Sequence, residues 1–141
     1  MSLESNSTSV DEGGLPPWLE PAIDELKALV QLPNDWNSYG ARPVARWAAE
    51  ETLIVLLETM DSATPQPIVV PTNRGGVQLE WHTEGIDLEI EILGSGQYSV
   101  LFEDRQSGDE WEQELARPHL EPIRAALAEL ARRSAAALIL G

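Results

Sequence analysis

The chain has no cysteine among its 141 residues, which excludes disulfide bonds, thiolate nucleophiles and cysteine-ligated zinc. It also lacks a run of the roughly 18 apolar residues that a membrane-spanning helix needs. Residues 1–14 contain neither the basic segment nor the apolar segment of a signal peptide. We therefore expect a soluble, cytoplasmic protein that does not engage a membrane.

Basic residues are scarce, since nine Lys and Arg stand against 24 Asp and Glu and give a formal net charge of -15. Nucleic-acid backbones attract clustered Lys and Arg, so this balance disfavours direct binding to nucleic acid. A basic protein surface is the partner that such a charge complements. We predict a basic protein partner and leave the oligomeric state open.

Aromatic residues make up only 6% of the chain, and five of them are Trp. With 43% hydrophobic residues, a chain of this length suits one domain with its own core. The first residues are rich in Ser, Asn, Thr and Gly, which bury little apolar surface. We predict a disordered acidic N-terminal lead-in over residues 1–15 and a single domain over residues 16–141.

The clearest two-residue periodicity lies in residues 75–93. Apolar residues alternate with polar ones there, and Thr83-Glu84-Gly85 interrupts the alternation. Because successive side chains of a strand point to opposite faces, this pattern predicts a β-hairpin with one buried face and one acidic face. The predicted buried residues are Val77, Leu79, Trp81, Ile86, Leu88, Ile90 and Ile92.

Helical and extended patterns flank this hairpin. We predict helices over residues 20–31 and from 43 to about 59. The apolar stripe of the second consists of Val44, Trp47, Ala48, Ile54 and Leu57, with Leu53, Leu56 and Met60 beside it. Strands are expected near residues 68–70, 98–102 and 110–115, and a last helix should follow Pro118, with Leu138, Ile139 and Leu140 docked on the protein. The expected architecture is α+β: two N-terminal helices, an antiparallel meander of four to five strands, and a C-terminal helix packed on the apolar sheet face.

The acidic sheet face is the most distinctive candidate site. Between Val77 and Ala116 there are eleven acidic residues against a single basic residue, Arg105. Like charges opposed on paired strands destabilise a sheet by roughly 0.2–1 kcal/mol a pair. Two interpretations stay open: an interface for a cationic partner, or solvated charge that favours solubility and prevents aggregation at sheet edges. The predicted interface residues are Glu80, Asp87, Glu89, Glu91, Glu112 and Glu114.

We predict no catalytic residue, no cofactor and no metal centre. Asp87, Glu89 and Glu91 would project from one strand about 7 Å apart, which is wide for chelation, and no loop has the spacing of a calcium site. His82 and His119 are the two histidines of the chain, and no His pair stands at a ligand spacing. Surface or capping roles are therefore favoured for both.

A polar loop near residues 32–41 contains two large aromatics, Trp36 and Tyr39, among turn-forming residues. Such aromatics either anchor a ligand or close one end of the core, and core closure is the favoured interpretation for a domain of this size. If the acidic face is an interface, Trp36, Tyr39 and Trp111 are its predicted aromatic contacts.

Two motifs resemble a family of small, uncharacterised bacterial proteins. They are Leu32-Pro33-x-x-Trp36-x-x-Tyr39-Gly40-Ala41 and Gly75-Gly76-Val77-Gln78-Leu79-Glu80-Trp81, with a long predicted helix between them. The resemblance spans about residues 32–93. It implies a bacterial origin and supports the predicted fold, and it assigns no functional residue.

Two functions compete on these observations. The first is a non-enzymatic acidic interaction module, such as a bacterial antitoxin, immunity protein or inhibitor, that covers a basic partner surface. The second is a small enzyme or ligand-binding domain that uses the loop of residues 36–40 as a lid or pocket wall. A deep pocket beside that loop would favour the second, and a solvated acidic face without such a pocket would favour the first.

Overall fold

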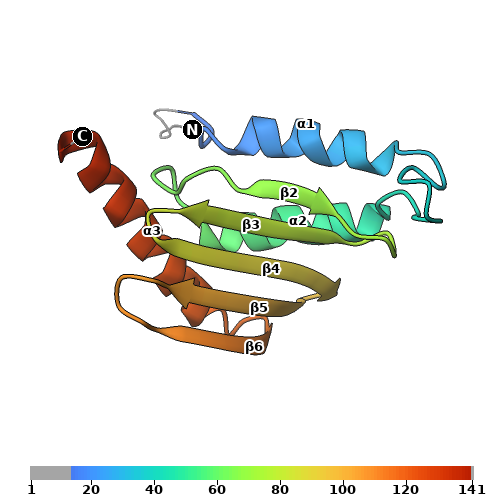
Figure 1. Cartoon of the computed structure of the whole chain (residues 1–141). Coiled ribbons are helices and arrows are strands. Elements are labelled where there is room, and N and C mark those ends of the chain that lie inside the picture. The colour runs from blue at the N-terminus through green and yellow to red at the C-terminus, as the bar shows by residue number, and fades with distance from the viewer. Residues whose placement is uncertain (1–13, 141) are drawn as a thin grey trace.

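The protein, represented by a computed structural model that describes residues 14–140, combines three helices with one five-stranded antiparallel sheet (Figure 1). Residues 1–13 of the predicted disordered lead-in lie outside the described residues. The strand order in the sheet is the order along the chain, which confirms the predicted α+β meander with a C-terminal helix. The elements are α1 (Leu19–Val30), α2 (Arg46–Thr59), β2 (Ile68–Pro71), β3 (Val77–Thr83), β4 (Ile86–Gly94), β5 (Gln97–Asp104), β6 (Glu110–Ala116) and α3 (Glu121–Leu140).

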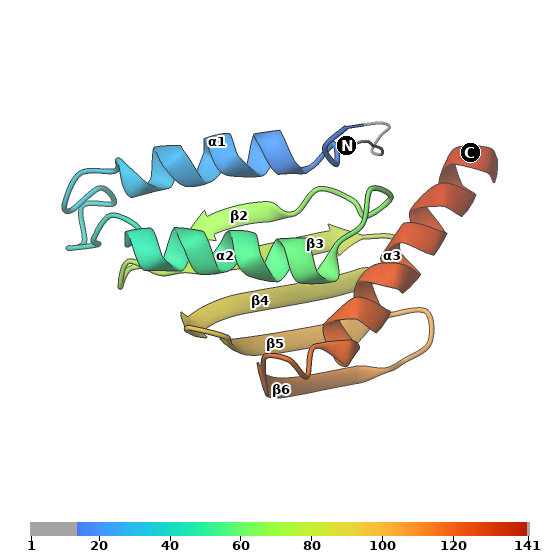
Figure 2. The same cartoon turned by 180° about the vertical axis from the view of Figure 1, so that it is seen from behind.

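The helices and the sheet form two layers. Helices α2 and α3 lie behind the sheet in Figure 1 and in front of it in Figure 2, while α1 runs beside β2 and α2. Buried side chains of α3, including Ile123, Leu127 and Leu130, join the same core as the apolar sheet residues. No helix among residues 14–140 covers the other face of the sheet, which is left to solvent (Figure 1).

The predicted hairpin is present as β3 and β4. Its two-residue turn, Glu84-Gly85, has φ values of 54° and 80°, as a turn that matches the twist of paired strands requires. This turn sets the register in which Leu79 faces Ile90 and Trp81 faces Leu88. All seven apolar residues predicted for the inner face are buried, so the face assignment is confirmed.

The predicted apolar stripe of α2 is correct only in part, since Ala48 and Leu56 are buried as expected but three of its larger residues are not. Trp47, Ile54 and Leu57 are 48%, 38% and 57% exposed, whereas Glu51 and Thr52 are buried. Glu51 occupies the core side because its carboxylate accepts a hydrogen bond from the Tyr98 hydroxyl and lies 3.0 Å from Nη2 of Arg117. A buried carboxylate with two such partners keeps its polar atoms satisfied.

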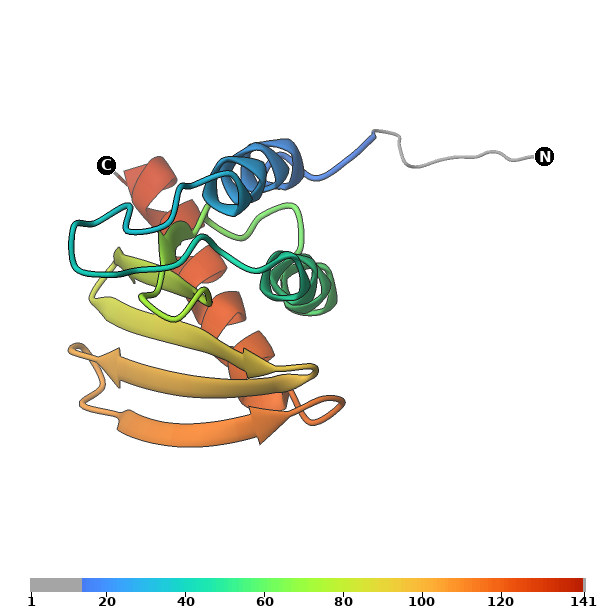
Figure 3. The same cartoon turned by 90° about the vertical axis from the view of Figure 1, so that its right-hand side faces the viewer.

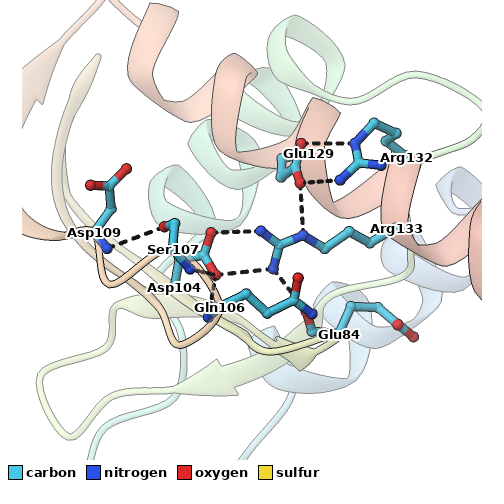
Figure 4. A network of polar contacts seen from close by, with 8 residues as sticks. All are labelled: Glu84, Asp104, Gln106, Ser107, Asp109, Glu129, Arg132 and Arg133. Carbon is cyan, nitrogen blue, oxygen red and sulfur yellow. Dashed lines mark hydrogen bonds and ion pairs between the residues drawn. The ribbon is translucent and has the colours of Figure 1, made fainter.

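Helix α3 is fastened to the turn between β5 and β6 by a polar network (Figure 4). Two guanidinium nitrogens of Arg133 reach the two oxygens of Asp104, at 3.0 Å and 2.6 Å, and its Nε donates to Glu129 at 2.7 Å. The bidentate geometry holds the pKa of Asp104 well below its usual range. The middle of α3 is thereby fixed against the sheet.

The end of α3 does not dock on the protein, contrary to the sequence prediction. Leu138, Ile139 and Leu140 are each more than 80% exposed, because the helix continues past the sheet that its earlier residues cover (Figure 1). Within residues 14–140, none of the helices combines the length and apolar character that a bilayer crossing requires.

Candidate functional site

The open face of the sheet carries three rows of polar side chains that run across the strands. One row contains Glu80, Glu89 and Glu112, a second contains Asp87, Glu103 and Glu110, and a third contains Glu91 and Glu114. We call these eight residues the acidic face. All six carboxylates predicted to form an interface lie on it, and Glu103 and Glu110 join them because the registers of β5 and β6 bring them into the second row.

Several carboxylates of the acidic face oppose each other directly. Glu80 faces Glu89 across the β3–β4 pair, and Glu103 faces both Asp87 and Glu110 on its two neighbouring strands. Each like-charged pair disfavours the sheet by some tenths of a kcal/mol up to about 1 kcal/mol. The folded sheet therefore holds electrostatic repulsion that a cation placed over it would relieve.

Part of this repulsion is relieved within the chain. The Arg105 guanidinium and the His82 imidazole both contact Asp87, whose pKa is lowered chiefly by its hydrogen bond with His82. The amide nitrogen of Gln78 lies 2.8 Å from Glu80 and 3.5 Å from Glu89, so it bridges the opposed pair. These contacts serve only the β3–β4 end of the acidic face.

His82 lies among three carboxylates. Its Nδ1 is 2.7 Å from Oδ1 of Asp87, and its Nε2 is 3.0 Å from Oε1 of Glu80 and 3.9 Å from Oε2 of Glu89. The hydrogen bond to Asp87, followed by the one to Glu80, raises the pKa of His82 above its ordinary value. These hydrogen bonds therefore favour the protonated, positively charged form of the imidazole.

Glu80, His82 and Glu89 also form a group of metal-ligating side chains, with one ligand atom from each lying within 4.8 Å of the others. Spacing along a single strand does not predict this group, because its members come from two strands. Glu80 and His82 are two residues apart on β3, and the strand register places Glu89 opposite Glu80. The signal available in the sequence was the Glu-x-His pair combined with the length of the hairpin.

The remaining carboxylates have no cationic partner within the described part of the chain. Glu91, Glu103, Glu110, Glu112 and Glu114 form no ion pair with any residue in the range 14–140. A hollow of about 120 Å³ opens beside three carboxylates of this face, and it is lined by Gln78, Glu89, Glu91, Ser99, Leu101 and Glu112. The lining therefore carries three carboxylates and no basic side chain.

The loop of residues 36–40 protrudes at the α1–α2 connection (Figure 3). Trp36 is half-buried and its indole N–H donates to the carbonyl of Arg42 at 2.7 Å, while Tyr39 is 87% exposed. The prediction that both aromatics close the core is therefore wrong for Tyr39. Asn37 donates to Asn73 in the β2–β3 turn, so the loop lies beside that end of the sheet.

Trp111 lies on the other side of the sheet from the acidic face. Its ring stacks on Phe102 at a centroid distance of 5.4 Å, on the side that α3 covers. Trp111 was predicted as an aromatic contact of an interface, and the alternation of β6 instead turns it away from Glu110 and Glu112. A partner on the acidic face would not meet the face of this ring.

Comparison of the chain with protein-family models, with curated proteins and with solved structures finds no match. The resemblance to a family of small bacterial proteins therefore stays a prediction.

Proposed function

We propose that this protein is a non-enzymatic interaction module of the antitoxin, immunity-protein or inhibitor type, which covers a basic protein surface in the bacterial cytoplasm. The observation that carries the proposal is the acidic face, a helix-free sheet surface with eight carboxylates, several of them directly opposed. A folded sheet that retains this repulsion gains stability when a cationic surface covers it. The lack of cysteine is compatible with a reducing cytoplasm.

The contacts of such a partner follow from the geometry. A Lys or Arg side chain would enter the hollow beside Glu89, Glu91 and Glu112, where no described cation competes for these carboxylates. Exposed Tyr39 would lie at the rim of the interface. Its loop is hydrogen-bonded to Asn73, and Asn73 lines the same groove as Glu91 of the acidic face. Steering would come from the carboxylates, and residence time from the aromatic contact.

The alternative function as an enzyme or ligand-binding domain gains no support from the loop of residues 36–40. The linings of five grooves on residues 14–140 include no residue of that loop. The apolar groove with the least polar lining lies between α1 and α2 instead, beside Ile23, Val30 and Leu53. The interaction module is therefore the function that the geometry favours.

The test begins with capture of the partner from the native host and continues with association kinetics of the purified pair across a salt series. The double reversal Glu91→Lys with Glu112→Lys should lower the on-rate by about tenfold or more, since steering by opposite charge accelerates association by 10 to 10³. Raising the ionic strength from 0.1 M to 1 M should produce the same loss, because the screening length falls from about 10 Å to about 3 Å.

A matched control changes the net charge equally at another place. Asp24 and Glu25 are exposed on α1, away from the acidic face, so Asp24→Lys with Glu25→Lys should leave most of the on-rate intact. An on-rate indifferent to salt and to the Glu91 and Glu112 reversals would reduce the acidic face to a solubility device. An equal loss in both double variants would show that net charge alone matters.

A further inference from the structure

One group on the acidic face differs in kind from the surrounding carboxylates, because it combines an imidazole with two carboxylates at ligand distances. Nε2 of His82 lies 3.0 Å from Oε1 of Glu80 and 3.9 Å from Oε2 of Glu89. Tetrahedral coordination with metal–ligand bonds of about 2.0–2.2 Å separates neighbouring donor atoms by roughly 3.3–3.6 Å. The two distances lie on either side of that range, and one ligand atom from each of the three side chains lies within 4.8 Å of the others.

We propose that Glu80, His82 and Glu89 bind a divalent first-row transition-metal ion, for which Zn²⁺ is the best match. The inference goes beyond the proposed interaction module and does not depend on it. The metal would take Nε2 of His82 and one oxygen from each glutamate. Because the face is open to solvent, water would fill the remaining position, as it does in zinc sites with three protein ligands.

The hydrogen bond on the far side of the imidazole supports this assignment independently of the two glutamates. Asp87 accepts from Nδ1 of His82 at 2.7 Å, and the Arg105 guanidinium fixes Asp87 in turn. With Nδ1 protonated, the lone pair of the neutral imidazole is on Nε2 and points towards Glu80 and Glu89. A carboxylate that orients a histidine in this way is the usual companion of a metal-bound imidazole, and it makes that imidazole a stronger ligand.

The donor set discriminates between cations. Calcium takes six to eight oxygen ligands and magnesium retains several waters around one or two carboxylates, so neither gains from a fixed imidazole. Zinc and its first-row neighbours bind imidazole well. The opposed pair Glu80 and Glu89 supplies two negative charges to neutralise the ion, and the ion removes the repulsion between them.

Protons compete with the metal for His82. The charged groups that face the imidazole are Glu80 on β3, Asp87 and Glu89 on β4, and Arg105 through Asp87; the carboxylates favour its protonated form. One proton must leave Nε2 before the metal binds. Zn²⁺ binding should therefore release this proton to the buffer.

The experiment is calorimetric titration of the full chain with Zn²⁺ at about pH 8, where fewer protons compete for the imidazole than at neutral pH. We expect saturable binding of one ion, lost in His82→Gln and retained in the control His119→Gln, which removes the other histidine of the chain. Glu89→Gln should weaken binding at least tenfold, whereas Glu112→Gln, which removes an equal charge from the same face, should change it less than twofold.

Asp87 is a positioning residue, and its variant has a readout beyond affinity. Asp87→Ala should weaken Zn²⁺ binding by 10- to 100-fold and alter the visible spectrum of the Co²⁺-substituted site, because the imidazole loses the carboxylate that orients it. Substituting Co²⁺ should give the intense visible absorption of a tetrahedral site. The proposal is overturned by the absence of saturable Zn²⁺ binding, by equal effects of Glu89→Gln and Glu112→Gln, or by displacement of Zn²⁺ by equimolar Ca²⁺.

All of these titrations use the chain without a partner. Loss of the zinc site would leave the charge-reversal results for Glu91 and Glu112 unaffected, and failure to capture a partner would leave the titrations unaffected. The two proposals can therefore fail separately.

Discussion

The buried carboxylate of Glu51 should be a major single polar contribution to the stability of this protein. Glu51 is 4% exposed, accepts a hydrogen bond from the Tyr98 hydroxyl and pairs with Arg117, so it joins α2, β5 and the segment after β6. Burial, followed by the hydrogen bond to Glu51, raises the pKa of Tyr98 well above its ordinary value. The hydroxyl therefore stays protonated and donates at every pH at which the protein is handled.

Glu51→Ala should destabilise the fold by about 3 kcal/mol. Removing one member of a buried ion pair costs about 3–5 kcal/mol, because the remaining charge is left uncompensated. The Arg117 side chain is 24% exposed and can be partly rehydrated, so we expect a loss of stability at the lower end of that range. Tyr98→Phe removes only one donor to a charged acceptor and should cost about 1.5–3 kcal/mol.

The assay is urea unfolding followed by fluorescence, for which the five Trp residues give a signal. Glu50→Ala is the matched control, since Glu50 is the preceding residue of α2 and is exposed; it should change the free energy of unfolding by less than about 0.5 kcal/mol. The double variant of Glu51 and Tyr98 should lose less than the sum of the single losses, because the two residues share one hydrogen bond. A loss for Glu51→Ala within about 1 kcal/mol of the control would refute this account of the buried network.

Two further predictions concern the two faces of the β3–β4 hairpin. Ile90→Asp places an unpaired carboxylate at a position that is 1% exposed and should abolish cooperative urea unfolding. Glu89→Lys, on the open face, should leave urea unfolding cooperative. Similar behaviour of the two variants would contradict the face assignment. Because the pKa of His82 is higher in the folded state than the unfolded-state value of 6.5, protonated His82 should stabilise the metal-free protein. This stabilisation should be complete below pH 6.5 and should disappear as the pH rises through the folded-state pKa. Stability measured with a chelator present should therefore fall over that range in the natural protein and stay level in His82→Gln.

The sheet could be predicted from the sequence because its signal is local. Two-residue alternation from Val77 to Ile92 identifies both faces, and Glu84-Gly85 marks the turn that joins the strands. The positions of the acidic residues follow from the same alternation. The position of Glu103 opposite Asp87 and Glu110 could not be predicted, because alternation alone does not fix the register between strands.

The features that escaped prediction depend on contacts between distant residues. Glu51 is buried because it contacts Tyr98 and Arg117, which lie 47 and 66 residues further along the chain, so no local pattern indicates its burial. The grouping of Glu80, His82 and Glu89 arises across two strands, so spacing along one strand concealed it. Nothing local to Tyr39 indicates whether its ring turns inward or outward.

The sequential order of the strands has a consequence for how the chain reaches its folded state. Each strand pair closes through a connection of at most five residues, so the entropy lost on forming each hairpin is small and the sheet can form early. The contact between Glu51 and Arg117 spans 66 residues and forms only when α2 reaches the sheet. We therefore expect the hairpins to set the speed of folding, and the polar contacts that tie the helices to them to set the lifetime of the folded state.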